Sequence, residues 1–152
     1  LFMGMIIILL AFFIQTGNVN GFVVWISLPI VITIGLINMA NNIRDRVKDK
    51  ASGRKTLPIL LGKKASITFM AAMYILAYLI VIFTALFKSG GSLFYLLVLF
   101  SFPMPIKAIR RFNKNDTPAS MMPAMAATGK TNTVFGILYA LGIYISALLG
   151  GI

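Results

Sequence analysis

Five long apolar stretches, separated by short polar segments, constrain the fold of this chain more than any other feature. A helix needs about 20 mostly apolar residues to cross a bilayer, where the backbone must satisfy its own hydrogen bonds. The stretches cover about residues 1–16, 22–42, 65–87, 93–109 and 131–149. We therefore predict an all-α integral membrane protein, with five transmembrane helices in one membrane domain that comprises residues 1–152.

The composition limits the chemistry that the chain can perform. Charged residues make up 11% of the chain, against about 25% in a typical soluble domain. There is no cysteine, histidine or glutamate, so thiolate and imidazole chemistry are excluded. The only acids are Asp45, Asp49 and Asp116. Any carboxylate chemistry of this chain must use these three residues.

The basic residues predict the orientation in the membrane. Of the 14 Lys and Arg residues, all but Lys88 lie in two connections, residues 44–64 and 107–130. Cytoplasmic loops carry such an excess, so we expect both connections to be cytoplasmic and the protein to lie in the cell membrane. The net charge of +11 is explained by this orientation, and we expect no nucleic-acid partner.

A polar stretch, residues 41–49, follows the second span. Asp45 and Asp49 are four residues apart, so they share one face if the helix continues past Asn42. A helical projection places further polar residues on the same side: Asn38, Asn41, Asn42, Lys48 and Ser52. Polar groups at membrane depth usually face a bundle interior and mark a site, which is the orientation that we expect here. Gly35, Gly136 and Gly142 lie inside spans, where small residues allow close helix packing.

Two carboxylates on one helix face are hard oxygen ligands, which suit Mg²⁺ together with substrate phosphates. Arg54 and Lys55 follow a few residues later and could bind a diphosphate. Alternatively, the two acids simply pair with Arg44, Arg46, Lys48 or Lys50 at a solvated helix end. The pair contains two of only three acids, and the polar stripe extends inward to Asn38. Both features favour a site. Asp116 is expected in a solvated turn.

The run from Asn41 to Leu57 has the form N-N-x-R-D-x-x-x-D-x-x-x-G-R-K-T-L. It resembles the second aspartate-rich motif of the UbiA superfamily of intramembrane prenyltransferases. Within that superfamily it is most similar to the 1,4-dihydroxy-2-naphthoate polyprenyltransferases of menaquinone synthesis, the MenA branch. Leu60-Leu61-Gly62 and the segment Lys130–Thr133 before the last helix also fit this family.

The resemblance implies a nine-helix bundle, of which the five predicted spans would be the last five. Members of the family carry two aspartate-rich motifs, and the first, N-x-x-x-D-x-x-x-D, is absent because no acid precedes Asp45. We therefore expect upstream helices of the same protein, and we expect residues 1–152 alone to be inactive.

The resemblance also implies a reaction and its ligands. A polyprenyl group would pass from polyprenyl diphosphate to an aromatic acceptor, 1,4-dihydroxy-2-naphthoate, with loss of CO₂ to give demethylmenaquinone. Asp45 and Asp49 would hold Mg²⁺ as the catalytic pair. Asn41, Lys48, Arg54 and Lys55 would contact the diphosphate, while the lipid bilayer and apolar helix walls would surround the prenyl tail.

Three other hypotheses remain open from the sequence. The acceptor could be another compound, such as 4-hydroxybenzoate, although the N-N-x-R-D form disfavours this. A phosphatidyltransferase would need more carboxylates than the chain has. A transporter or non-enzymatic membrane subunit is disfavoured because transport sites usually lie near the midplane of the bilayer, whereas this polar cluster lies at a helix end.

Overall fold

The computed structural model of the chain describes residues 2–88 and 91–149, which are largely helical. In chain order the elements are η1 (Phe2–Ile6, π-helical), α1 (Ile7–Thr16), α2 (Gly21–Ala51), α3 (Leu57–Phe87), η2 (Leu93–Ser101, 3₁₀), α4 (Pro103–Lys114) and α5 (Met122–Leu148). Four helical segments are long and apolar enough to cross a membrane: α2, α3, the combined η2–α4 segment and α5. The segment Gly4–Thr16 is a shorter apolar helix. The predicted all-α membrane architecture is confirmed.

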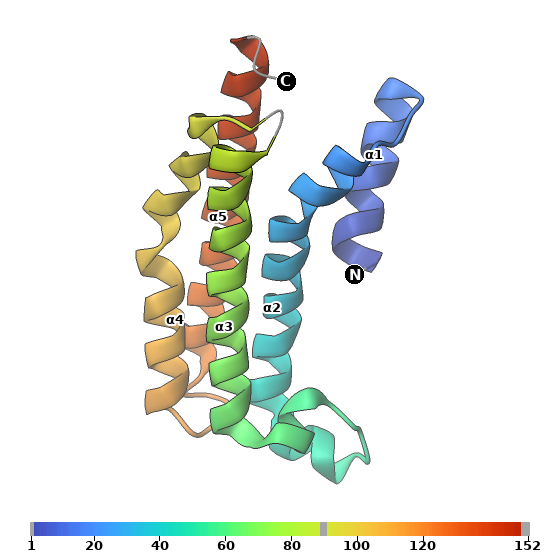
Figure 1. The fold of residues 1–152 in the computed structure, drawn as a ribbon. Helices are drawn as coiled ribbons and strands as arrows, with labels where there is room; N and C mark the ends of the chain where they lie inside the picture. Colours follow the sequence, from blue (N-terminus) through green and yellow to red (C-terminus); the bar gives the residue numbers. More distant parts are fainter. Residues whose placement is uncertain (1, 89–90, 150–152) are drawn as a thin grey trace.

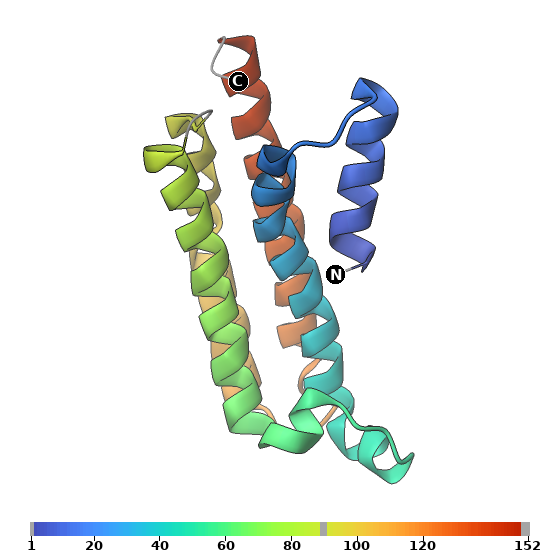
Figure 2. The same ribbon diagram turned by 45° about the vertical axis from the view of Figure 1, so that its right-hand side comes forward.

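The four long segments run side by side as a bundle, and α1 lies next to α2 at its edge (Figures 1 and 2). Helix α2 packs against α3 and α5, and α4 packs against the same two helices. Within the described residues the backbones of α2 and α4 do not approach each other closely, so these two helices lie diagonally across the bundle and meet through side chains. Each helix of the bundle therefore keeps an outward face.

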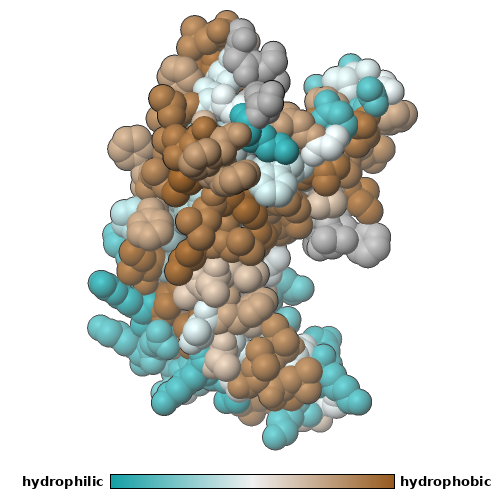
Figure 3. Space-filling view, in the orientation of Figure 1, coloured by the Kyte–Doolittle hydropathy of each residue, from teal (hydrophilic) through white to brown (hydrophobic). Residues whose placement is uncertain are grey.

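The connections alternate between the two ends of the bundle. The basic segments that follow α2 and α4 both lie at the lower end in Figure 1, while the turn after α1, the end of α3 and the start of η2 lie at the upper end. Hydrophilic residues gather at the lower end of the molecule, and apolar residues cover much of its upper part (Figure 3). This distribution agrees with a helical protein that has one strongly basic side.

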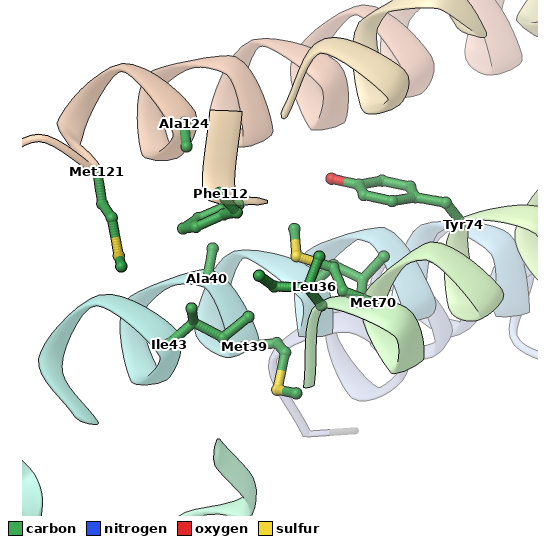
Figure 4. Close-up of a cluster of buried hydrophobic side chains, with 10 residues drawn as sticks. Leu36, Met39, Ala40, Ile43, Met70, Tyr74, Phe112, Met121 and Ala124 are labelled. Carbon is green, nitrogen blue, oxygen red and sulfur yellow. The ribbon is translucent and has the colours of Figure 1, made fainter. Parts of the chain in front are cut away.

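Two buried clusters hold the bundle together. The cluster nearer the basic end joins α2 to the other three helices, and Figure 4 shows Leu36, Ala40 and Ile43 of α2 facing Phe112 and Ala124. The second cluster joins α3, η2 and α5 in the other half of the bundle; it consists of Ala77, Tyr78, Val81, Tyr95, Val98, Phe135 and Tyr139. The first cluster fixes the part of α2 that leads into the polar stretch.

Several helices are longer than the apolar stretches that predicted them. Helix α3 starts at Leu57, with Pro58 in its first turn, and α5 starts at Met122, with Pro123 in its first turn. Proline favours the first turn of a helix because its missing N–H is not needed there. Helix α3 is kinked at Gly62, whose φ of 80° is left-handed and suits glycine. The predicted spans therefore missed the first turns of α3 and α5, which contain proline, glycine and lysine among apolar residues.

The fourth span is not one straight α-helix. Residues Leu93–Ser101 are 3₁₀-helical and α-helix begins at Pro103. Pro103 and Pro105 lack the N–H groups that α-helical bonding would use. The Phe102 N–H donates instead to the Leu99 carbonyl at 3.0 Å, and the Ser101 hydroxyl donates to the Val98 carbonyl at 2.6 Å. The change from 3₁₀-helix to α-helix therefore coincides with the two prolines.

Candidate functional site

Helix α2 continues for nine residues beyond Asn42 and ends at Ala51. Asp45 and Asp49 therefore lie one turn apart on one helix, as the sequence predicts. Ile43, which is 2% exposed, anchors this last part of α2 in the apolar cluster. The packing of the apolar side of α2 thus sets the direction of its polar side.

The polar side of α2 faces outward from the four-helix bundle. Gly35 and Asn38 are exposed, whereas Leu36 and Ala40 are buried. Apolar side chains of α2 fill the interior of these four helices. That the polar stripe faces the interior of a nine-helix bundle stays a prediction. Asn38 lies inside the predicted span 22–42, where an amide exposed to lipid would be costly. This face therefore suits a polar cavity better than contact with lipid.

Asp45 is held by its neighbour in the chain. The Arg44 guanidinium donates from Nε to Oδ1 at 2.8 Å and from Nη2 to Oδ2 at 2.6 Å. Such bidentate pairs fix both partners in orientation. The Arg44 Nη1 atom also lies 3.7 Å from the Met122 Sδ atom, at the start of α5. Arg44 thus links the candidate site to α5, a role that the sequence analysis did not assign to it.

Asp49 is the more buried carboxylate, since its side chain is 8% exposed. The chain reverses after α2, and the Arg54 backbone N–H donates to the Asp49 carbonyl at 2.9 Å. This turn brings the Arg54 guanidinium to the carboxylate, with Nη1 at 3.2 Å from Oδ1. The Arg54 side chain is 69% exposed, so most of its donors face outward. A predicted carboxylate and a predicted diphosphate-binding cation are therefore neighbours.

The other predicted site residues lie close in the chain but make none of the three ion pairs of the described residues. Asn41 is half-buried on α2, one turn before Asp45. Lys48, near the end of α2, and Lys55, in the following turn, are both exposed. Their mobile ammonium groups can reach an anion near the end of α2. A further polar group, not predicted as a site residue, lies on α5, where the Oδ1 atom of Asn132 is buried without a partner among the described residues.

Asp116 belongs to a different surface. The Lys63 ammonium donates to its carboxylate at 2.6 Å and also to the Asn115 carbonyl at 2.6 Å. The Asp116 side chain is 87% exposed, and Lys63 holds the pKa of this carboxyl below its usual value. The predicted solvated turn agrees with this position. Asp116 fixes the loop before α5 to the start of α3.

The donor set at the end of α2 fits a magnesium ion that is shared with a substrate. The described residues contain no group of three or more acidic, histidine or cysteine side chains that could enclose a metal. Mg²⁺ does not require one, because it is usually held by one or two carboxylates together with waters and substrate phosphates. Each carboxylate has about four lone-pair positions, so the arginine contacts of Asp45 and Asp49 leave acceptor capacity for a metal.

The chain is similar to known proteins along most of its length. A family model described as the UbiA prenyltransferase family matches residues 1–128. The chain is 44% identical to the 1,4-dihydroxy-2-naphthoate octaprenyltransferase of Bacillus subtilis. The match covers 95% of this chain and 46% of that protein. The chain is also 32% identical to the UbiA prenyltransferase domain-containing protein 1 homolog of Drosophila melanogaster. That match covers 90% of this chain and 36% of the homolog.

The 1,4-dihydroxy-2-naphthoate octaprenyltransferase of Escherichia coli is 29% identical over 70% of the chain and 34% of its own length. The chain therefore spans less than half the length of these curated relatives. No solved structure matches it. The match to most of the chain, together with the helical architecture and the paired aspartates of α2, shows that this chain belongs to the UbiA prenyltransferase family.

Proposed function

We propose that this chain forms part of a Mg²⁺-dependent aromatic polyprenyltransferase and supplies its second aspartate-rich motif. The observation that carries the proposal is the end of α2, where Asp45 and Asp49 lie one turn apart with Arg54 beside Asp49. The donor group is a polyprenyl diphosphate. The acceptor is 1,4-dihydroxy-2-naphthoate, supported by the 44% identity to the Bacillus subtilis octaprenyltransferase.

Each residue has a defined part in the proposed reaction. Asp45 and Asp49 would hold Mg²⁺, and Arg44 orients the Asp45 carboxylate. When bound, the ion would supply positive charge against the diphosphate. Arg54, Lys48 and Lys55 bind the diphosphate oxygens and stabilise their charge as the allylic carbon–oxygen bond breaks. Asn41 contributes an amide to the same face. The acceptor ring then forms the new carbon–carbon bond, and its carboxylate leaves as CO₂.

An apolar groove offers a place for the prenyl tail. It has a volume of ≈ 330 Å³ and lies between α1, α2 and α5, where its walls include Phe12, Ile26, Ile30 and Ile143. Ile30 is two turns before Asn38 on α2, so the groove continues the polar face toward the upper end of the bundle. Isoprenoid units are apolar, and their burial in such a groove contributes about 25 cal/mol per Å².

The membrane placement follows from the charge distribution. We propose that the basic end of the bundle lies in the cytoplasm and that the protein lies in the cell membrane, with the polar end of α2 at the cytoplasmic surface. Upstream helices of the same protein would cover the outward polar face of α2. They would supply the other half of the metal and diphosphate site.

The test is a turnover assay with the full-length protein in membranes. Polyprenyl diphosphate and 1,4-dihydroxy-2-naphthoate should give a prenylated product, diphosphate and CO₂ only when Mg²⁺ is present. Asp45→Asn and Asp49→Asn should each lower kcat about 100-fold or more, because the charge that holds the ion contributes several kcal/mol. Asp116→Asn is the matched control. Full activity of either α2 variant, or turnover that survives chelation of Mg²⁺, would contradict the site.

The choice of acceptor is tested separately with 4-hydroxybenzoate in the same assay. Prenylation of 4-hydroxybenzoate in preference to 1,4-dihydroxy-2-naphthoate would leave the metal site in place but reassign the acceptor.

A further inference from the structure

A second basic site lies between α4 and α5, outside the region assigned to the prenyl transfer. A cleft of ≈ 280 Å³ is lined by three cationic side chains, Lys107, Arg111 and Lys130. Its remaining walls are small or apolar: Met104, Ala126 and Ala127. Hydrophilic side chains project along the lower left of Figure 3, where Figure 1 places α4.

Within the part of the chain that the structure describes, none of these three cations forms an ion pair with a carboxylate. The chain has three acids, and in the structure Asp45, Asp49 and Asp116 pair with Arg44, Arg54 and Lys63. Three like charges that converge on one cleft repel one another unless an anion or water screens them. The site therefore has a strong electrostatic preference for an anion.

Arg111 is held in place at the cleft. Its Nη1 atom donates to the Pro123 carbonyl in the first turn of α5, at 3.0 Å. A guanidinium has five N–H donors, so the others remain available to a ligand. This contact bridges α4 and α5 and keeps a planar donor group beside the two lysines. Such a geometry suits phosphate oxygens.

The depth of the cleft identifies the source of the phosphate. Lys107 is seven residues before the end of α4, and Lys130 is eight residues after the start of α5. At 1.5 Å per residue, both lie about 10–12 Å from the basic ends of their helices. With the basic end of the bundle in the cytoplasm, as proposed above, this distance places both lysines near the level of the lipid headgroups. Basic pockets between membrane helices on the cytoplasmic side are suited to anionic headgroups.

The cleft is also separate from the polar face of α2. No residue of α2 lines it, and α2 lies diagonally across the bundle from α4. The apolar walls at Met104, Ala126 and Ala127 suit the glycerol and first acyl carbons of a lipid. They offer a free diphosphate no hydrogen bonds from their side chains. We propose that the α4–α5 cleft is a binding site for the phosphate headgroup of an anionic phospholipid in the cytoplasmic leaflet.

The experiment measures lipid selectivity of the full-length protein in phosphatidylcholine nanodiscs that contain spin-labelled phosphatidylglycerol or spin-labelled phosphatidylcholine. The wild-type protein should immobilise phosphatidylglycerol preferentially. The triple variant Lys107→Gln, Arg111→Gln, Lys130→Gln should lose about tenfold or more of that preference, since each cation near an anionic lipid contributes about a fivefold factor. The preference of the wild type should also fall as salt is added.

Two further variants separate the cleft from general charge and from misfolding. The control Lys64→Gln, Arg110→Gln, Lys114→Gln removes the same residue types from exposed positions, none of which lines this cleft, and should keep the preference. The charge-conserving variant Lys107→Arg, Lys130→Arg, which leaves Arg111 in place, should also keep it. An unchanged preference in the first triple variant, or an equal loss in the control, would overturn the proposal. Displacement of the lipid by inorganic diphosphate with Mg²⁺ would instead assign the cleft to the diphosphate.

Discussion

The two carboxylates of α2 have different surroundings although they occupy the same helix face. The Asp49 side chain is 8% exposed and its cation, Arg54, comes from the following turn. The Asp45 side chain is 33% exposed and its cation is the preceding residue in the helix. Asp45 can therefore contact a ligand on the open face of α2 directly. Arg54 is placed to extend the site from Asp49 toward the solvent.

This difference leads to a prediction for Arg54. In the full-length protein, Arg54→Ala should raise the KM for polyprenyl diphosphate about tenfold, because a hydrogen bond to a charged group contributes about 1.5–3 kcal/mol. Arg54→Lys should recover part of the loss, since lysine keeps the charge but not the planar donor geometry. The measurement is the steady-state rate as a function of polyprenyl diphosphate concentration.

Lys50 provides the matched control for this prediction. It is an exposed cation in the last turn of α2, and Lys50→Ala should leave the KM within about twofold, as expected for a screened surface charge. Equal effects of Arg54→Ala and Lys50→Ala would show that only the general positive potential matters and would remove Arg54 from the site.

At the scale of the elements, the space around each glycine shows whether two helices pack closely at that position. A Cβ atom at Gly142 would lie 2.4 Å from the Phe94 carbonyl oxygen, so α5 and η2 approach through this residue. The predicted close packing is confirmed there. At Gly136 the nearest atom would be the Ile30 Cδ1 at 3.9 Å, an ordinary contact. At Gly35 nothing lies within 4 Å among the described residues, so close packing at that position stays a prediction.

Gly142→Ala should therefore destabilise the bundle. The added methyl meets backbone rather than a movable side chain, so we expect a loss of about 1–3 kcal/mol and a lower unfolding temperature in detergent. Gly136→Ala is the control on the same helix and should be neutral or slightly stabilising, because alanine is the better helix former. A Gly142→Ala protein that unfolds at the wild-type temperature would contradict the close approach of η2 and α5.

At the scale of the whole molecule, the basic end and the opposite end should lie on different sides of the membrane. The chain has no cysteine, so single cysteines can report each end. In a full-length background free of other cysteines, Asn18→Cys should react with a membrane-impermeant maleimide on intact cells. Ser52→Cys should react only after the membrane is opened.

Both positions are exposed in the structure, so a lack of labelling would not reflect burial in the bundle. Labelling of Ser52→Cys on intact cells, with protection of Asn18→Cys, would reverse the proposed orientation. It would also place the end of α2 on the outer side of the membrane.

Much of the fold follows from the sequence because the bilayer imposes one strong rule. A run such as residues 65–87 can satisfy its backbone in lipid as a helix, so its existence is readable from hydropathy alone. The helix ends are less readable. The first turns of α3 from Leu57 and of α5 from Met122 precede the predicted runs 65–87 and 131–149, and each helix has a proline in its first turn. The 3₁₀ segment depends on how backbone donors are shared around Pro103.

The candidate site also has one part that the sequence predicts and another that only the structure shows. The spacing of Asp45 and Asp49 fixes their shared face once α2 is helical, and the sequence therefore suffices for it. The sequence does not determine that Asp45 forms its ion pair with Arg44 or that Asp49 forms one with Arg54. Those contacts depend on side-chain directions and on the turn after Ala51. The sequence likewise gives no sign that Lys107, Arg111 and Lys130 meet, because two helices must first pack together.

By itself, the sequence determined that this protein is a helical membrane protein with one basic side and a pair of aspartates at a helix end. Hydropathy, charge and helical period are local properties, and each can be counted along the chain. Only the tertiary structure decided that the polar face of α2 lies outside the four-helix bundle. It also decided that three cations of α4 and α5 share a cleft. These features depend on which helix faces compete for the core, and apolar side chains such as Leu36 and Ile43 occupy it.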